Sequence, residues 1–396
     1  MQRISDEQRR IRIGRRHLLA SEARAQSPVA VADALVALHA TDAATVFLSV
    51  CARLSDPGVA AVEGCLYEDL SLVRMLSMRN TLFVVSDEMA PRVEAANARA
   101  VAAKERRTLL KHLKEDGNDL DEHWLDEAER STLAFLDHSG PASGSELAAG
   151  VAALRTKITL FPGKKQETVQ GVATRVIRVL AAEGKIRRDR PRGSWTSSQF
   201  RWAPARPRPV EETARAQAEL ALCWLRAYGP ATEADLKWWT GWGTRDVRTA
   251  LAEVEAEEVR LDGGAAAWVA PGDAGPEPAP APWAALLPAL DPSAMGWADR
   301  GFHLPTEHRA ALFDRSGNIG PTVWWDGRIV GGWAQRGDGE PVWRLLTDVG
   351  REASTAIEAE ASRLSAWVGE ARVTPRFRTP LERELTGLSH RAAGFT

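Results

Sequence analysis

One motif occurs twice in the chain, and the two copies lie 89 residues apart. Residues 140–147 read Gly-Pro-Ala-Ser-Gly-Ser-Glu-Leu, and residues 229–236 read Gly-Pro-Ala-Thr-Glu-Ala-Asp-Leu. In each copy the Ser or Thr can cap a helix, and the acidic residue that follows favours the positive end of that helix. An internal repeat of this kind indicates tandem copies of one structural module.

Each copy belongs to a pattern of helices followed by a two-stranded hairpin, which is typical of a winged helix. The second unit continues with a helix over 168–183 and a hairpin over 184–202 that has an Arg-rich tip. The third unit continues with a helix over 244–254 and an acidic wing over 259–269, which we expect to pack against a neighbouring part of the protein. An earlier unit shows the same order, since helices precede two predicted strands about a tight turn over 72–85.

The pattern changes beyond a Pro/Gly/Ala-rich boundary at 272–282. Residues 322–325, 328–335 and 342–346 are predicted strands joined by the hairpin signals Asp-Gly and Gly-Asp-Gly, so they favour a small antiparallel sheet or barrel. The predicted fold is mainly α with β wings, in the α+β class. We assign residues 1–92, 93–209 and 210–275 to three units of the winged-helix type, and 276–396 to a C-terminal β region and tail.

The composition predicts a cytoplasmic protein. The chain has 396 residues, and no apolar run approaches the roughly 20 residues needed to span a bilayer. The basic N-terminus has no apolar core, so it is not a secretory signal. Three scattered cysteines, Cys51, Cys65 and Cys223, lack metal-ligand spacing and fit a reducing compartment. We expect no metal.

The net charge of −2 hides a strong asymmetry. Residues 151–209 contain 14 Lys and Arg against 3 Asp and Glu, which gives that segment about +11. A localised basic segment predicts an anionic partner, here nucleic acid, whereas the alternative is a solvated helix face. The candidate DNA-binding residues are Arg79, in the first hairpin, where the alternative is a structural ion pair, and Arg175, Arg178, Lys185, Arg187, Arg188, Arg190 and Arg192.

A short polar cluster between two apolar segments is the candidate active site. His39, Thr41 and Asp42 separate a predicted helix over 31–38 from another over 45–54, and we expect them at a helix–helix junction that faces a cleft. Asp42 or Thr45 can cap the second helix. His39 and Asp42 would share a face if the helix continued. The alternative is a core histidine beside two capping residues.

Several segments resemble the bacterial winged-helix DNA glycosylases, of the azinomycin-resistance and interstrand-crosslink types. The matching segments are 38–42 (Leu-His-Ala-Thr-Asp), 78–82 (Met-Arg-Asn-Thr-Leu), 229–232 (Gly-Pro-Ala-Thr), 238–241 (Trp-Trp-Thr-Gly), 290–300 and 325–333. The resemblance implies three tandem winged-helix units, a C-terminal β-barrel, a concave surface for duplex DNA, and removal of N-alkylated purines without metal or cofactor. It also implies an active-site Gln-x-Gln or Gln-x-Asp, for which this chain has His39 and Thr41.

These residues predict a monofunctional glycosylase that works in repair or in self-resistance to a genotoxin. His39 could activate water, Thr41 could orient it, and Asp42 could support His39 or the positive charge on the sugar. Asp291, Trp297 and Arg300 favour a lock between domains over a DNA-lining role. We expect a monomer bound to duplex DNA in the bacterial nucleoid. The alternative function is a non-catalytic DNA-binding protein, such as a regulator or a damage sensor.

Overall fold

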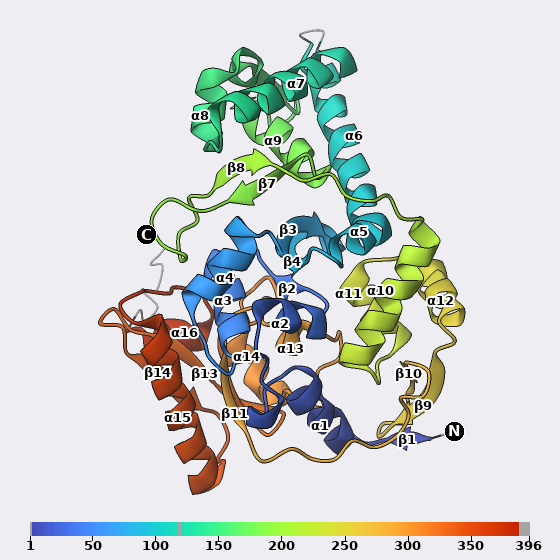
Figure 1. The fold of residues 1–396 in the computed structure, drawn as a ribbon, viewed down its shortest axis with the longest axis vertical. Coiled ribbons are helices and arrows are strands. Elements are labelled where there is room, and N and C mark those ends of the chain that lie inside the picture. Colours follow the sequence, from blue (N-terminus) through green and yellow to red (C-terminus); the bar gives the residue numbers. More distant parts are fainter. Residues whose placement is uncertain (1, 118–119, 388–396) are drawn as a thin grey trace.

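The computed structural model describes residues 2–117 and 120–387. Figure 1 shows a smaller upper part above a larger body, and the body holds both the N-terminal helices and the C-terminal sheet. Helices and strands are mixed throughout, which confirms the α+β class. None of the described helices combines the length and the apolar composition needed to cross a membrane.

The first part of the body surrounds a three-stranded sheet of order β2-β4-β3. Its elements are α1 (Asp6–Arg16), α2 (Pro28–Ala34), β2 (Leu38–His39), α3 (Ala43–Cys51), α4 (Val59–Glu63), β3 (Leu72–Ser77) and β4 (Thr81–Ser86). The predicted hairpin over 72–85 is therefore confirmed. The predicted helix–helix junction at His39, Thr41 and Asp42 is wrong. Val36 takes a left-handed φ of 64° and ends the helical path, and residues 38–39 then pair with β4 as a strand.

The upper part has a hydrophobic core of its own, drawn from residues between Leu109 and Trp202. Its elements are α6 (Arg99–Asp116), which follows the short α5 (Ala90–Val93), then α7 (Glu122–Ser139), α8 (Gly144–Gly150), β5 (Lys157–Leu160), β6 (Thr168–Gly171), α9 (Ala173–Ala182), β7 (Ile186–Asp189) and β8 (Arg201–Pro204). The pair β7–β8 is the predicted Arg-rich hairpin, and Figure 1 places it between the upper part and the body.

The repeated motif performs the same task in both copies. Ser143 and Thr232 each cap a helix, and the carboxylates of Glu146 and Asp235 accept from the backbone N–H groups of these capping residues, so both are complete capping boxes. The second copy starts α11 (Glu233–Thr240), which follows α10 (Thr213–Tyr228) and precedes α12 (Thr244–Glu253).

The acidic wing packs against the N-terminus of the chain, as its charge predicted. Its strands β9 (Glu257–Leu261) and β10 (Ala266–Val269) form a sheet with β1 (Arg3–Ile4), which runs parallel to β9. Arg3 pairs with Asp262 at the wing, and Arg16 pairs with Asp273 just beyond it.

The C-terminal strands form an open sheet, so the predicted barrel is wrong. The order is β11 (Ala284–Leu287), β12 (Thr322–Trp325), β13 (Arg328–Gln335) and β14 (Pro341–Leu345), all antiparallel. In the described chain β11 and β14 do not pair, and four strands are too few to close around a packed interior. Helix α15 (Gly350–Val368) packs on β11, and α16 (Pro380–Leu385) packs on β13. The remaining helices are α13 (Pro292–Met295) and α14 (Arg309–Leu312).

A buried ion pair joins the first part of the body to the C-terminal part. The side chains of Arg53 and Asp291 are both 0 % exposed, and two nitrogens of Arg53 contact the two carboxylate oxygens at 2.9 and 2.7 Å. Ser49 donates to the same carboxylate, and Arg53 also donates to the hydroxyl of Ser293. Asp291 therefore serves in the lock that the sequence favoured.

Candidate active site and nucleic-acid interface

His39 is a buried, neutral imidazole on an edge strand. Its backbone pairs with Phe83 of β4, and the two rings meet edge-on with centroids 5.4 Å apart. Only 7 % of the residue is exposed, and Nδ1 has no hydrogen-bond partner among the described residues. Burial, together with the positive charge of Arg79, lowers the pKa of His39 to about 4. The ring is therefore uncharged near pH 7 and has one nitrogen able to accept a proton.

Thr41 and Asp42 lie in the turn before α3, and both are partly exposed. Asp42 caps α3, because its Oδ1 accepts from the N–H of Ala44 at 3.2 Å, so this predicted cap is confirmed. Its Oδ2 accepts from the backbone N–H of Arg376 at 2.9 Å. The extended backbone at His39 removes the helical spacing behind the expected shared face, and the Asp42 carboxylate contacts the C-terminal segment instead of the imidazole.

Arg79 occupies the turn between β3 and β4, where its φ is 53°. Its guanidinium lies over the ring of Trp238 on α11, with 4.1 Å between the central carbon and the ring centroid. In the described part of the chain its Nε has no hydrogen-bond partner, and burial lowers its pKa. The structure thus holds Arg79 by a cation–π contact rather than by the ion pair considered above.

Most of the predicted DNA-binding side chains of the upper part are engaged within the protein. Their partners are Glu105 for Arg178, Glu129 and Glu183 for Lys185, Asp189 for Arg187, Glu63 and Glu68 for Arg190, Glu146 for Arg192, and His112 for Arg175. Several of these pairs are exposed, where an ion pair is worth little and can be exchanged for a phosphate contact.

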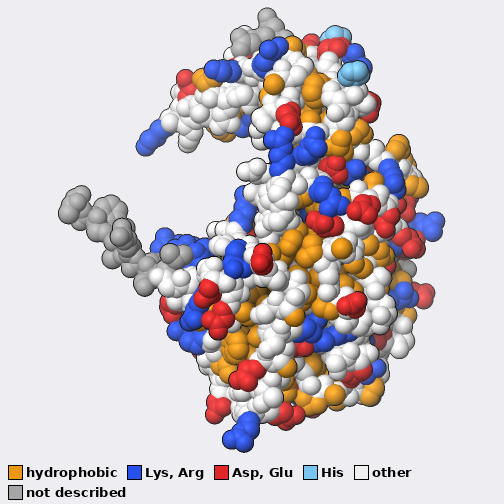
Figure 2. Space-filling model, turned by 60° about the vertical axis from the view of Figure 1, so that its left-hand side comes forward, with side chains coloured by type: hydrophobic (Ala, Val, Ile, Leu, Met, Phe, Trp, Pro, Cys, Tyr) orange, Lys and Arg blue, Asp and Glu red, His pale blue; other side chains and the backbone are white. Residues whose placement is uncertain are grey.

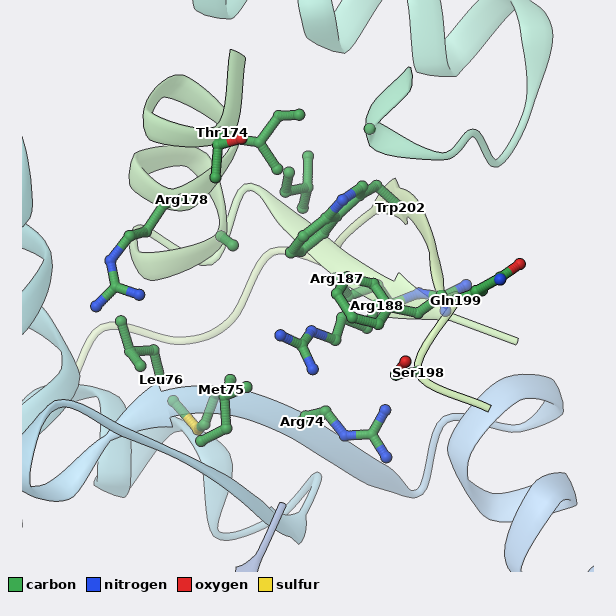
Figure 3. Close-up of a pocket in the computed structure, with 16 residues that line it drawn as sticks. Arg74, Met75, Leu76, Thr174, Arg178, Arg187, Arg188, Ser198, Gln199 and Trp202 are labelled. Atoms are coloured by element: carbon green, nitrogen blue, oxygen red, sulfur yellow. The ribbon is translucent and has the colours of Figure 1, made fainter. Parts of the chain in front are cut away.

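Arg188 differs from its neighbours because no carboxylate pairs with it among the described residues. Its guanidinium lies 3.7 Å from the centroid of the Phe200 ring. Burial, and then the positive charges of Arg74 and Arg376, lower its pKa to about 9. Figure 3 shows Arg188 and Arg74 on opposite walls of a pocket between the wing and β3.

The predicted site residues lie near opposite edges of the three-stranded sheet β2-β4-β3. His39 is on β2, and Arg79 is at the tip of the β3–β4 hairpin, so these two lie together. The pocket at Arg188 lies beside β3, which forms the opposite edge of the sheet, and His39 does not line it. In Figure 2 the molecule is deeply hollowed between the upper part and the body, and Lys and Arg side chains gather along the hollow.

Comparison with known proteins identifies the family. The family model of the AlkZ-like DNA glycosylases matches residues 32–367, which is most of the chain. The chain belongs to the AlkZ-like DNA glycosylase family. Among solved structures, the DNA glycosylase AlkZ of Streptomyces sahachiroi is similar with a TM-score of 0.70 and 23% identity, over 95% of this chain and 100% of that one. A search of curated proteins finds no match.

Membership of this family confirms the resemblance and the reaction class, which is DNA glycosylase chemistry. The matched region begins before His39, so it includes the candidate active site. Within residues 2–117 and 120–387, no three His, Cys, Asp or Glu side chains gather as a metal site would require.

Sequence reasoning missed two residues that share the pocket with Arg188. Arg74 is the single charged residue of strand Leu72–Ser77, and Phe200 precedes β8. A single Arg inside an apolar strand was a detectable signal, because a charged group there needs a partner or a site. The sequence carried no such signal for Phe200, since its contact with Arg188 depends on how the hairpin folds.

Proposed function

We propose that this enzyme hydrolyses the N-glycosidic bond of alkylated purines in duplex DNA, including bulky or crosslinked adducts, for repair or genotoxin self-resistance in the bacterial cytoplasm. The family match over residues 32–367 is the observation that carries the proposal. An N3- or N7-alkylated purine is cationic and leaves readily. The glycosidic electron pair goes to the purine and neutralises it, while water adds to the anomeric carbon and loses a proton.

In this proposal His39 receives a hydrogen bond from the attacking water and then its proton. The ring is uncharged, as a base that takes a proton from water must be, which supports that role. Thr41 orients the water, and the carboxylate of Asp42 adds negative potential near the sugar. A cationic leaving group needs no acid to protonate it, so these three residues are enough.

We further propose that residues 1–92, 93–209 and 210–275 are three winged-helix units, followed by the C-terminal region 276–396. The paired capping boxes and the hairpins after α9 and α12 support this division. The duplex would lie in the hollow of Figure 2, with phosphates on Arg79, on the wing from Lys185 to Arg192, and on Arg175 and Arg178.

The reaction is tested on duplex DNA that carries a single N3- or N7-alkylated purine. After incubation, hot alkali breaks the strand at abasic sites. We expect breaks with the native protein and a loss of about 10²-fold in His39→Ala, within the range for removal of a general base. His138→Ala, which replaces an exposed histidine, is the matched control. His39→Gln restores the residue type that the family resemblance implies and should retain more activity than His39→Ala.

The pH dependence tests whether the reaction needs the uncharged form of His39. Because the pKa of His39 is lowered to about 4, the single-turnover rate should stay flat from pH 8 to 6 and fall only near pH 4 to 5. Breaks that are unchanged in His39→Ala would reject the assignment of the base. A protein that binds duplex DNA yet yields no breaks on any alkylated substrate would be a DNA-binding protein instead.

A further inference from the structure

The pocket between the wing and the first hairpin is not explained by the reaction at His39. It has a volume of about 390 Å³, within the range of pockets that hold small ligands. Its lining includes the apolar side chains of Leu76, on β3, and Ile177, on α9, and the aromatic rings of Phe200 and Trp202. The two aromatic rings meet edge-on, with centroids 5.3 Å apart.

Two guanidinium groups in this pocket, those of Arg74 and Arg188, lack anionic partners in the part of the chain that the structure describes. No Asp or Glu is among the lining residues. Nε and Nη2 of Arg74 are buried without a hydrogen-bond partner in the described chain, and so is Nε of Arg188. The other two lining arginines, Arg178 and Arg187, are already paired with Glu105 and Asp189.

Unpaired, partly buried charges are costly unless an anion completes the site. Arg74 and Arg188 lie on facing walls, so one phosphate between them could bind both (Figure 3). The Arg188 guanidinium already lies over the Phe200 ring, and together with the apolar lining residues this pair would suit a flat ring stacked beside it, because stacking on an aromatic side chain tolerates any base. Gln199 and Ser198, also in the lining, offer an amide and a hydroxyl to the edge of a base.

We propose that this pocket binds one unstacked nucleotide, with its base against Phe200 and its phosphate between Arg74 and Arg188. The expectation that the nucleotide belongs to DNA rests on the proposed function. The match between the pocket and a nucleotide is independent of that function. The pocket is separate from the candidate active site, because β4 lies between β2, which carries His39, and β3, which carries Arg74. An unpaired nucleotide could therefore be held while the reaction proceeds elsewhere.

The test uses the full chain and undamaged DNA. Fluorescence anisotropy compares a fully paired duplex with the same duplex carrying one bulged 2-aminopurine nucleotide. We expect the native protein to prefer the bulged duplex by about tenfold, which corresponds to one stacked base. Arg74→Gln and Phe200→Leu should each reduce this ratio of affinities to near one. Arg130→Gln and Phe161→Ala, an exposed arginine and an exposed phenylalanine of the same upper part, should keep the native ratio.

Two further measurements extend the test, and the first needs no variant. The 2-aminopurine fluorescence should fall on binding to the native protein, because stacking on an aromatic ring quenches it. Deoxyadenosine monophosphate is the second arm. Saturable binding of this free nucleotide without a preference for the bulge, if Arg74→Gln abolishes the binding, would support the site and assign it to free nucleotides.

The proposal is overturned if the native protein shows neither a preference for the bulge nor binding of the free nucleotide. It is also overturned if folded Arg74→Gln and Phe200→Leu variants both keep the preference. Because all of these assays use undamaged DNA, their outcome does not depend on base excision. A failure in the hot-alkali assay would reject the proposed reaction and leave the nucleotide site standing.

Discussion

Replacing Asp291 tests whether the buried ion pair holds the body together. Its carboxylate accepts from Arg53 at 2.7 and 2.9 Å, from the Ser49 hydroxyl at 2.7 Å and from the Ser293 N–H at 2.9 Å. In Asp291→Ala all four donors lose this acceptor, and the guanidinium remains buried without a counter-charge. Removing one partner of such a pair costs about 3–5 kcal/mol, much more than the pair itself adds over apolar residues.

The expected shift in melting temperature follows from the size of the chain. Unfolding entropy is about 2.1 cal/mol/K per residue, which gives about 0.8 kcal/mol/K for this chain, so a loss of about 4 kcal/mol lowers the Tm by about 5 °C in one cooperative transition. The upper part has its own core, and its unfolding should be unaffected if it melts separately.

Urea unfolding and calorimetry measure both quantities, and two variants control them. Arg130→Ala removes an exposed ion pair to Glu127 and should change the free energy of unfolding by less than about 1 kcal/mol. The double variant Arg53→Met with Asp291→Leu removes both charges and should be more stable than Asp291→Ala alone. A loss below about 1 kcal/mol in Asp291→Ala, or a double variant less stable than the single one, would refute the reasoning.

Three other perturbations have defined outcomes. Burial lowers the pKa of His17 to about 3 and that of His39 to about 4, so below pH 6.5 the unfolded chain binds protons that the folded chain does not. The free energy of unfolding, measured in urea titrations, should therefore fall as the pH drops from 6.5 to 4, by about 2 kcal/mol per histidine at pH 5. Gly296→Ala places a Cβ 2.4 Å from ring atoms of Tyr228 and should cost about 1–3 kcal/mol in the same assay. Thr232→Ala breaks a capping box and should cost about 1 kcal/mol, whereas full stability would show that the cap contributes nothing.

The parts of the fold that could be predicted from the sequence are those specified by local signals. The helix caps at Ser143 and Thr232 and the hairpin over 72–85 depend on residues that are close in the sequence, and all three form as expected. Strand β2 could not be predicted, since two residues have no measurable period and the strand exists only through its pairing with β4. Closure of the C-terminal sheet is likewise a long-range property, which hairpin signals between neighbouring strands do not determine.

The candidate site, like the fold, could be predicted from the sequence only in part. The sequence identified His39, Asp42 and Arg79 as residues to examine, and the structure brings His39 and Arg79 together. The sequence could not predict that Asp42 contacts the backbone of Arg376, because the two residues are far apart in the chain.

Charge was the strongest sequence signal for DNA binding, and the structure changes how it should be interpreted. The segment 151–209 carries about +11, but many of its cations pair with acids from outside it, including Glu63, Glu105 and Glu129. A sum over a segment counts these cations as available, although each is partly neutralised by a residue that lies far away in the sequence. Arg188 contributes one charge to that sum and Arg74 contributes none, yet neither guanidinium pairs with a carboxylate among the described residues. The anionic ligand should therefore bind where pairing fails, which is the pocket between β3 and β7.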